Sequence, residues 1–251
     1  MSSHLPPEIL DLIVDHLHAD PETLKTCCLV SKAWIHRTRR YFFKLVKIRS
    51  RSVHKWRENF PDPLNSPARH VRTLSIDLTG LISDADVNTL LTFRNVSRLD
   101  VGTIGRNDQT LSLVPLHGFC PAVESLRISS SSLPSSKIFD LICSFPILQN
   151  FMFVGYPASR LVDGRTWNTP STSPRLTGSL TLRLMKWIGH FIFRLLNLPN
   201  GVHFRRIVVS WMVPEDAEST MDLVSRCSDT LECLEISGSV IRVFFWIPVL
   251  D

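Results

Sequence analysis

The stretch "VRTLSI", at residues 71–76, is the first of seven short phrases that recur along most of this chain of 251 residues. The others are "VSRLDV" at 96–101, "VESLRI" at 123–128, "LQNFMF" at 148–153, "TGSLTL" at 177–182, "FRRIVV" at 204–209 and "LECLEI" at 231–236. Their fourth letters stand at positions 74, 99, 126, 151, 180, 207 and 234, which gives intervals of 25, 27, 25, 29, 27 and 27 residues. A period of this length is typical of stacked structural repeats.

Each phrase predicts a β-strand, because its fourth and sixth letters are apolar and strands alternate with a period of two. Helix-like or turn-rich segments follow most phrases, and Ser83–Asp86 and Pro214–Asp216 have the residues of helix starts. A single strand-and-helix unit cannot bury its own apolar edge, so neighbouring units stack. The sequence therefore predicts a curved parallel sheet on the inner side of an arc.

This repeating unit resembles a leucine-rich repeat in a degenerate form. Some repeats keep an apolar residue at the eleventh position, namely Leu81, Leu133 and Ile241. Thr79, Ser131 and Ser239 stand where that family usually has Asn or Cys. The resemblance implies an α/β solenoid of about seven degenerate repeats over residues 70–251.

The first fifty residues follow a helical pattern instead. Pro7 is tolerated in the first turn of a helix, and Glu8 favours the positive end of the helix dipole. Asp20 is the expected N-cap of a second helix, and a third is expected to start at Ser31. The expected apolar faces are Ile9, Ile13 and Leu17, then Leu24, Cys27, Cys28 and Val30, then Trp34, Ile35, Tyr41, Phe42, Leu45 and Val46. Three short helices make a very small core.

The pattern "LPPEIL…IVDHL…DPETLKTCCLVSKAW" resembles an F-box over about residues 4–48. In that family the module binds the linker subunit that connects to a cullin in an SCF ubiquitin ligase. The resemblance implies contact or contact-supporting roles for Leu5, Pro6, Glu8, Ile9, Val30 and Trp34. The alternative is that these residues only form a helical core, although so small a module needs a partner to cover apolar surface.

The expected fold class is therefore α+β, with three regions. Residues 1–50 form the F-box-like three-helix module, and residues 70–251 form the leucine-rich-repeat-like solenoid that binds a substrate. Between them, residues 51–69 are expected to be a proline-containing linker, because "ENFPDPLNSPAR" has three prolines and no periodicity.

Two features of the repeats suit the binding of a target protein. The fifth letters of the phrases make one column along the exposed face of the sheet: Ser75, Asp100, Arg127, Met152, Thr181, Val208 and Glu235. Residues 155–178 form a long Gly-, Pro-, Ser- and Thr-rich stretch, and long loops in compact folds are often binding loops. The candidate substrate-binding residues are Arg127, Met152, Arg160, Arg165, Trp167 and Thr181. The alternatives are solvated strand faces and an insertion without a role.

The net charge of +5 comes from one segment, since Lys32–Arg57 holds ten Lys or Arg and no Asp or Glu. The remaining 18 basic and 23 acidic residues sum to −5. A solvated basic face explains such a segment, and no common nucleic-acid-binding signature accompanies it. A nucleic-acid binder that uses residues 32–57 is the less favoured alternative.

The sequence carries no P-loop, zinc-protease, hydrolase or kinase signature, so we expect a non-catalytic adaptor without cofactor or metal. The six cysteines lack paired metal-site spacing and are expected to be reduced.

Neither a signal peptide nor a bilayer-spanning run is recognisable, which indicates cytoplasm and/or nucleus and not secretion. The expected partners are the cullin-linking subunit and an unidentified target protein, without a membrane. A scaffold that delivers no substrate is the alternative function.

The apolar stretch "SGSVIRVFFWIPVLD" after the seventh strand is no polar cap for a stack of repeats. We expect it either to fold back as a lid over that strand or to mark a chain cut short within a longer arc.

Overall fold

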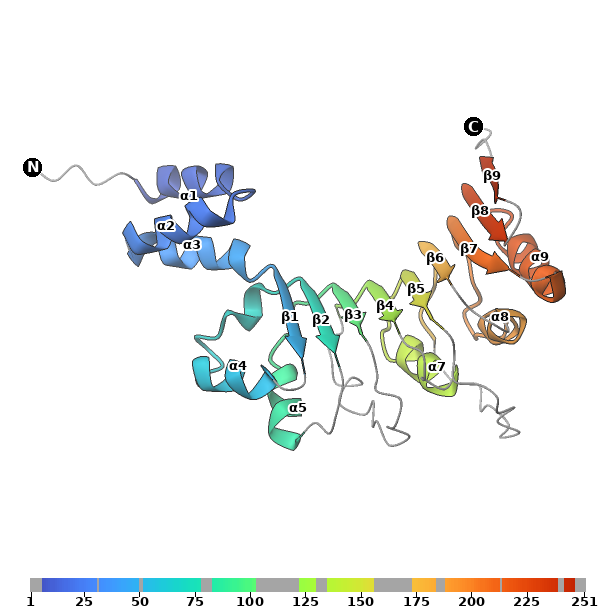
Figure 1. Ribbon diagram of the computed structural model, residues 1–251, viewed down its shortest axis with the longest axis horizontal. Helices are drawn as coiled ribbons and strands as arrows, with labels where there is room; N and C mark the ends of the chain where they lie inside the picture. Colours follow the sequence, from blue (N-terminus) through green and yellow to red (C-terminus); the bar gives the residue numbers. More distant parts are fainter. Residues whose placement is uncertain are drawn as a thin grey trace, which may run out of the picture.

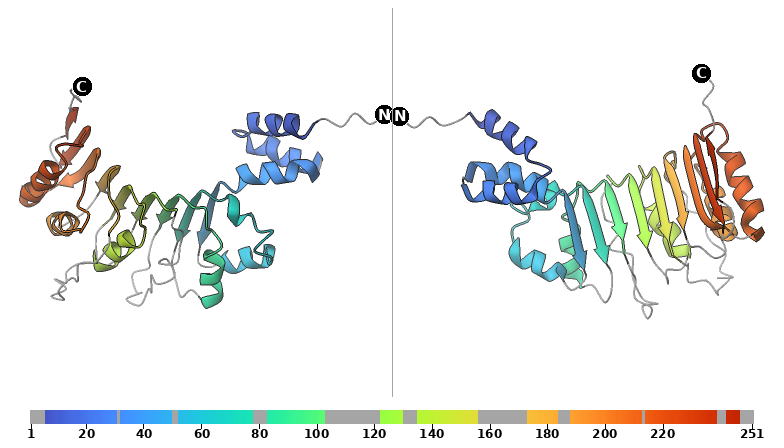
Figure 2. Two further views of the ribbon diagram at one scale, coloured as in Figure 1. Left: turned by 180° about the vertical axis from the view of Figure 1, so that it is seen from behind. Right: turned by 45° about the horizontal axis from the view of Figure 1, so that its top comes forward.

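A computed structural model describes residues 6–30, 32–49, 52–77, 83–102, 122–129, 135–155, 173–183, 188–212, 214–238 and 242–246. Figure 1 shows a small group of helices at one end of a long curved sheet, with further helices along the outer side of the curve. Figure 2 shows the same arrangement from behind and tilted so that its top comes forward, and in the tilted view the inner face of the sheet is open along its length.

Nine strands are found in the described parts of the chain, and they lie side by side in chain order in one sheet. They are β1 (Leu45–Arg49), β2 (Thr73–Asp77), β3 (Arg98–Val101), β4 (Ser125–Ser129), β5 (Asn150–Val154), β6 (Ser179–Arg183), β7 (Arg206–Met212), β8 (Cys233–Gly238) and β9 (Arg242–Trp246). Strands β1 to β8 are parallel. The seven phrases form β2 to β8, and their fourth letters pair directly from strand to strand, so the predicted parallel sheet is confirmed.

Helices cover the outer face of the sheet. They are α4 (Val53–Asn59), α5 (Asp84–Leu90), α7 (Ser135–Cys143), α8 (Ile188–Leu196) and α9 (Ala217–Arg226), with short 3-10 turns η2 (Pro67–His70) and η3 (Pro214–Asp216). The predicted start of α5 is confirmed, because Ser83 and Asp86 form a capping box. Leu74 and Ile76 of β2 are fully buried beneath the helices, whereas Thr73 and Ser75 are half-buried on the open face.

Strand β1 corrects the predicted boundary of the helical module. Leu45 and Val46 were expected to continue the third helix, but they start a strand in which Val46 pairs with Leu74. The segment "FKLVKI", at residues 43–48, is an eighth copy of the phrase, placed 28 residues before the first. A short apolar run fits a helix and a strand equally well by periodicity alone, so the sequence pattern does not identify this copy as a strand.

The region predicted as a linker, residues 51–69, is largely part of the solenoid. Its helix α4 carries Trp56, whose ring packs at centroid distances of 5.8 Å against Phe43 and 5.0 Å against Phe93. Val53 and Ala68 are buried in the main core. The prolines do not prevent this structure, because Pro67 occupies the first turn of η2, where a missing N–H costs nothing.

The N-terminal helices are α1 (Pro7–His16), α2 (Pro21–Val30) and α3 (Lys32–Phe42). As predicted, α1 begins at Pro7, and the Asp20 carboxylate accepts hydrogen bonds from the backbone N–H groups of the first turn of α2. The residues buried between these helices are Val14, Leu24, Cys27 and Thr38. None of them belongs to the core of the sheet, so the module has a small core of its own.

Strand β9 runs antiparallel to β8, and its register places residue 246 opposite Cys233 and residue 242 opposite Ser237. It therefore occupies the backbone edge that β8 would otherwise leave open. This arrangement agrees with the predicted fold-back of residues 242–246, whereas 239–241 and 247–251 lie outside the described residues.

Candidate functional site

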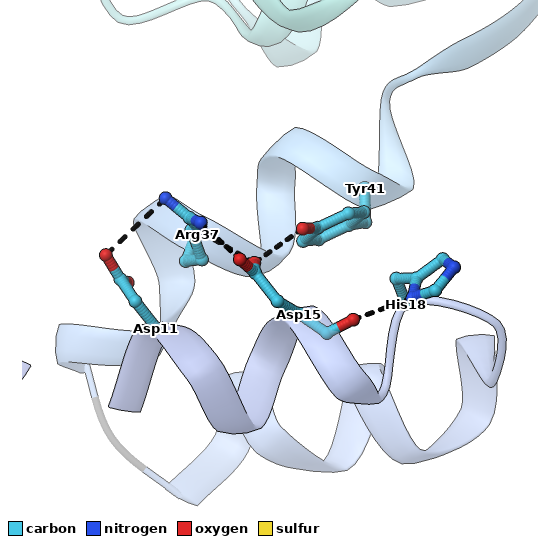
Figure 3. Close-up of polar contacts among 5 residues, drawn as sticks. All are labelled: Asp11, Asp15, His18, Arg37 and Tyr41. Carbon is cyan, nitrogen blue, oxygen red and sulfur yellow. Dashed lines mark hydrogen bonds and ion pairs between the residues drawn. The ribbon is translucent and has the colours of Figure 1, made fainter. Parts of the chain in front are cut away.

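A partly buried polar cluster joins α1 to α3 in the helical module (Figure 3). Arg37 donates to both carboxylate oxygens of Asp15, from Nε at 2.8 Å and from Nη2 at 2.5 Å. Tyr41 donates from its hydroxyl to Asp15 Oδ1 at 2.5 Å, and Asp11 lies 3.5 Å from Arg37 Nη1. Hydrogen bonds from Arg37 and then Tyr41 lower the pKa of Asp15 to about 2. The carboxylate therefore stays ionised and links α1 to α3 through these hydrogen bonds.

The sequence pattern gives no sign of this cluster, which joins Asp11 and Asp15 of α1 to Arg37 of α3. Asp15 and Arg37 are 22 residues apart, in different helices. No spacing rule links such a pair, because the rules that predict side-chain pairs apply within one helix.

The same module leaves several large apolar side chains exposed. On α1 these are Ile9 (42% exposed) and Leu12 (56%), and at the end of α2 they are Leu29 (87%) and Val30 (70%). Val30 was expected on the apolar face of the second helix, but at 70% exposure it is not part of the core of the module. Leu12 and Leu29 are also exposed, although neither was among the candidate binding residues predicted from the sequence.

The structure also describes three of the other residues carried over from the F-box resemblance. Pro6 and Glu8 are exposed at the start of α1, with Glu8 in its first turn. Trp34 is half-buried in α3. Leu5 lies outside the described residues.

The open face of the sheet carries the predicted fifth-letter column. Arg127, Met152 and Thr181 occupy directly paired positions on β4, β5 and β6, so the sheet brings these three candidates together. Lys47 of β1 extends the column by one strand. Val208 departs from the expectation of an exposed apolar position, since it is only 4% exposed. Arg160, Arg165 and Trp167 lie outside the described residues.

Cationic side chains prevail on the open face of β1 to β8. The cationic positions are Lys47, Arg49, Arg98, Arg127, Arg183 and Arg206, and the anionic ones are Asp77, Asp100 and Glu235. Ion pairs join Arg98 to Asp100 at 3.6 Å and Arg206 to Glu235 at 3.8 Å. The remaining cations give this face a positive character, which favours the approach of an acidic surface.

The described residues include side chains of the metal-ligating and nucleophilic types. They contain no group of three or more His, Cys, Asp or Glu side chains that could hold a metal ion. Burial raises the pKa of Cys143 to about 11 and also raises that of Cys227, so both thiols stay protonated and are poor nucleophiles. Cys27 is buried, and the Cys28 sulfur lies 2.8 Å from the Thr38 hydroxyl.

The fold and these two surfaces define a strand-and-helix solenoid with an attached helical module, a class of architecture in which extended surfaces bind other macromolecules. In the parts of the chain that the structure describes, no helix has both the length and the apolar character needed to cross a bilayer. Comparison with known protein families, with curated proteins and with solved structures finds no match to this chain.

Proposed function

We propose that this chain is a non-catalytic substrate-recognition adaptor of an SCF-type cullin ubiquitin ligase, acting in the cytoplasm and/or nucleus. The helical module, in its resemblance to an F-box, binds the cullin-linking subunit. The solenoid, in its resemblance to leucine-rich repeats, holds a target protein. Other subunits of the ligase carry out ubiquitin transfer.

The observation that carries the proposal is the exposed apolar surface of a module that has its own small core. Ile9 and Leu12 on α1, together with Leu29 and Val30 on α2, expose apolar surface that a partner helix or groove would cover. Three helices with so few buried side chains gain stability when a partner removes that surface from water. Pro6 and Ile9 are exposed at the start of α1, and both match the F-box pattern.

The open face of the sheet supports target binding. Its column of paired side chains from β1 to β8 makes one continuous surface, and concave surfaces of this kind suit extended partners. The excess of Lys and Arg on this face, including Lys47, Arg127 and Arg183, indicates a target with an acidic segment.

Binding of the cullin-linking subunit tests the first half of the proposal. A Pro6→Ala, Ile9→Ala double variant should co-purify with that subunit at least tenfold more weakly, because truncated apolar anchors typically cost about 2 kcal/mol. The matched control is Phe193→Ala, which truncates an apolar side chain exposed to 62% on α8, away from the module. Far-ultraviolet circular dichroism verifies that each variant is folded.

Unchanged co-purification of the folded double variant would contradict the assignment of this surface. Turnover of captured proteins separates an adaptor from a scaffold. Captured proteins should accumulate in cells that carry the double variant in place of the original chain. If they are bound but their half-lives do not change, the scaffold interpretation replaces the adaptor.

A further inference from the structure

A cavity of about 590 Å³ lies where the helical module meets the start of the sheet. Its walls come from α3, from the turn that leads into β1, and from η2 and the residue before β2. The lining residues are Arg37, Arg40, Tyr41, Lys44, Arg69, His70 and Arg72. Neither of the surfaces in the proposed function includes this cavity.

The lining holds five Arg or Lys side chains and no carboxylate. Arg37 forms ion pairs with Asp15 and Asp11, which do not line the cavity. In contrast, Arg40, Lys44 and Arg72 make no ion pair with any carboxylate among the described residues. Cations gathered around one space repel one another, and a bound anion relieves that repulsion.

The cavity is held in shape by the backbone. Arg37, Arg40 and Tyr41 share one side of α3, since residues three and four apart are neighbours on a helix. The carbonyl oxygen of Lys44 accepts hydrogen bonds from the N–H groups of Arg72 and Thr73, each at 2.9 Å. The two cationic walls are therefore fixed against each other before any ligand arrives, which lowers the entropic cost of binding.

We infer that this cavity binds a small, multiply charged anion that bears phosphate groups. Guanidinium groups recognise phosphate oxygens through paired hydrogen bonds, and an ammonium such as that of Lys44 adds a point charge. The volume lies within the range of about 300–1,000 Å³ that is usual for small-molecule sites. The bound anion would contact both α3 and η2 and add to the contacts that already hold the helical module against the sheet.

Inorganic tripolyphosphate is the probe, titrated into the purified full chain by calorimetry at constant ionic strength. Saturable binding at one site and a rise in melting temperature are expected, and sodium chloride of equal ionic strength should produce neither. An Arg40→Gln, Lys44→Gln variant should bind at least tenfold more weakly. Both residues are exposed, so the variant should fold. The matched control is Lys55→Gln, Arg226→Gln, which removes two exposed charges outside the cavity.

Absence of saturable binding to the original chain would overturn the inference. Equal losses in the cavity variant and the control variant would also overturn it, because they would indicate general charge attraction. A duplex DNA oligonucleotide forms the last arm of the test. If DNA binds through Arg40 and Lys44 while tripolyphosphate does not, the ligand is a nucleic-acid backbone and not a small anion.

Discussion

Asp15 links α1 to α3 in the helical module. Its carboxylate accepts hydrogen bonds from Arg37 and Tyr41, which lower its pKa from 3.8 to about 2 in the folded chain. A folded-state pKa below the unfolded value means that protonation favours unfolding. This interaction therefore contributes its full stability above about pH 4 and loses it as the pH falls towards 2.

An Asp15→Asn variant should lower the urea midpoint of the helical module at pH 7, because a neutral amide cannot replace the charge-assisted bonds to Arg37. The difference from the original chain should shrink between pH 4 and pH 2. Circular dichroism during urea titration at several pH values measures both effects. Glu22→Gln is the control, since Glu22 pairs with Lys25 on the exposed surface and such pairs contribute little. A difference that is independent of pH would contradict the assigned role.

At the scale of elements, β1 determines where the solenoid begins. Ile48 is 3% exposed and lies in the main core, while its neighbour Lys47 is exposed on the open face. Ile48→Ala should destabilise the sheet by about 2–5 kcal/mol, through lost burial and the cavity that remains. Lys47→Ala should change stability by less than about 0.5 kcal/mol. Denaturant unfolding measures both, and equal effects would place β1 outside the cooperative core.

Strand β9 covers the edge of β8, and its removal tests whether that cover matters. Deletion of residues 242–251 would leave unpaired backbone groups along Cys233–Ser237. Exposed strand edges pair with other chains, so the shortened protein should melt at a lower temperature and aggregate. Light scattering during a thermal ramp records both changes. The same melting temperature and solubility as the full chain would show that β9 is dispensable.

On the scale of the whole molecule, the two cores are separate. A substitution in one proposed binding surface should therefore weaken binding there and leave binding at the other surface unchanged. Arg127→Glu reverses a charge in the middle of the open face, beside Met152. This variant should capture fewer target proteins while it retains the cullin-linking subunit. Affinity purification with quantitative mass spectrometry measures the two losses together.

Lys55→Glu is the control for Arg127→Glu, since Lys55 is exposed on α4 at the outer side of the arc. The captured set should not change with this control. An unchanged set with Arg127→Glu as well would show that targets bind elsewhere.

The sequence by itself determined the strands β2 to β8, their parallel order and the face that each residue takes. Apolar residues at the fourth and sixth letters of each phrase, such as Leu126 and Ile128, have one buried solution in a stack of similar units. The helix starts at Pro7, Asp20 and Ser83 were also predictable, because capping depends on residues close together in the chain.

Only the tertiary structure decided which elements meet. It placed Leu45–Arg49 in the sheet and not in a helix, because pairing with β2 overrides the local pattern of a short apolar run. The tertiary structure left Val30 exposed. It also joined Asp15 to Arg37 and brought Arg40, Lys44 and Arg72 to the walls of one cavity. These contacts link residues far apart in the chain, and their geometry depends on how whole helices and strands pack, which no local spacing records.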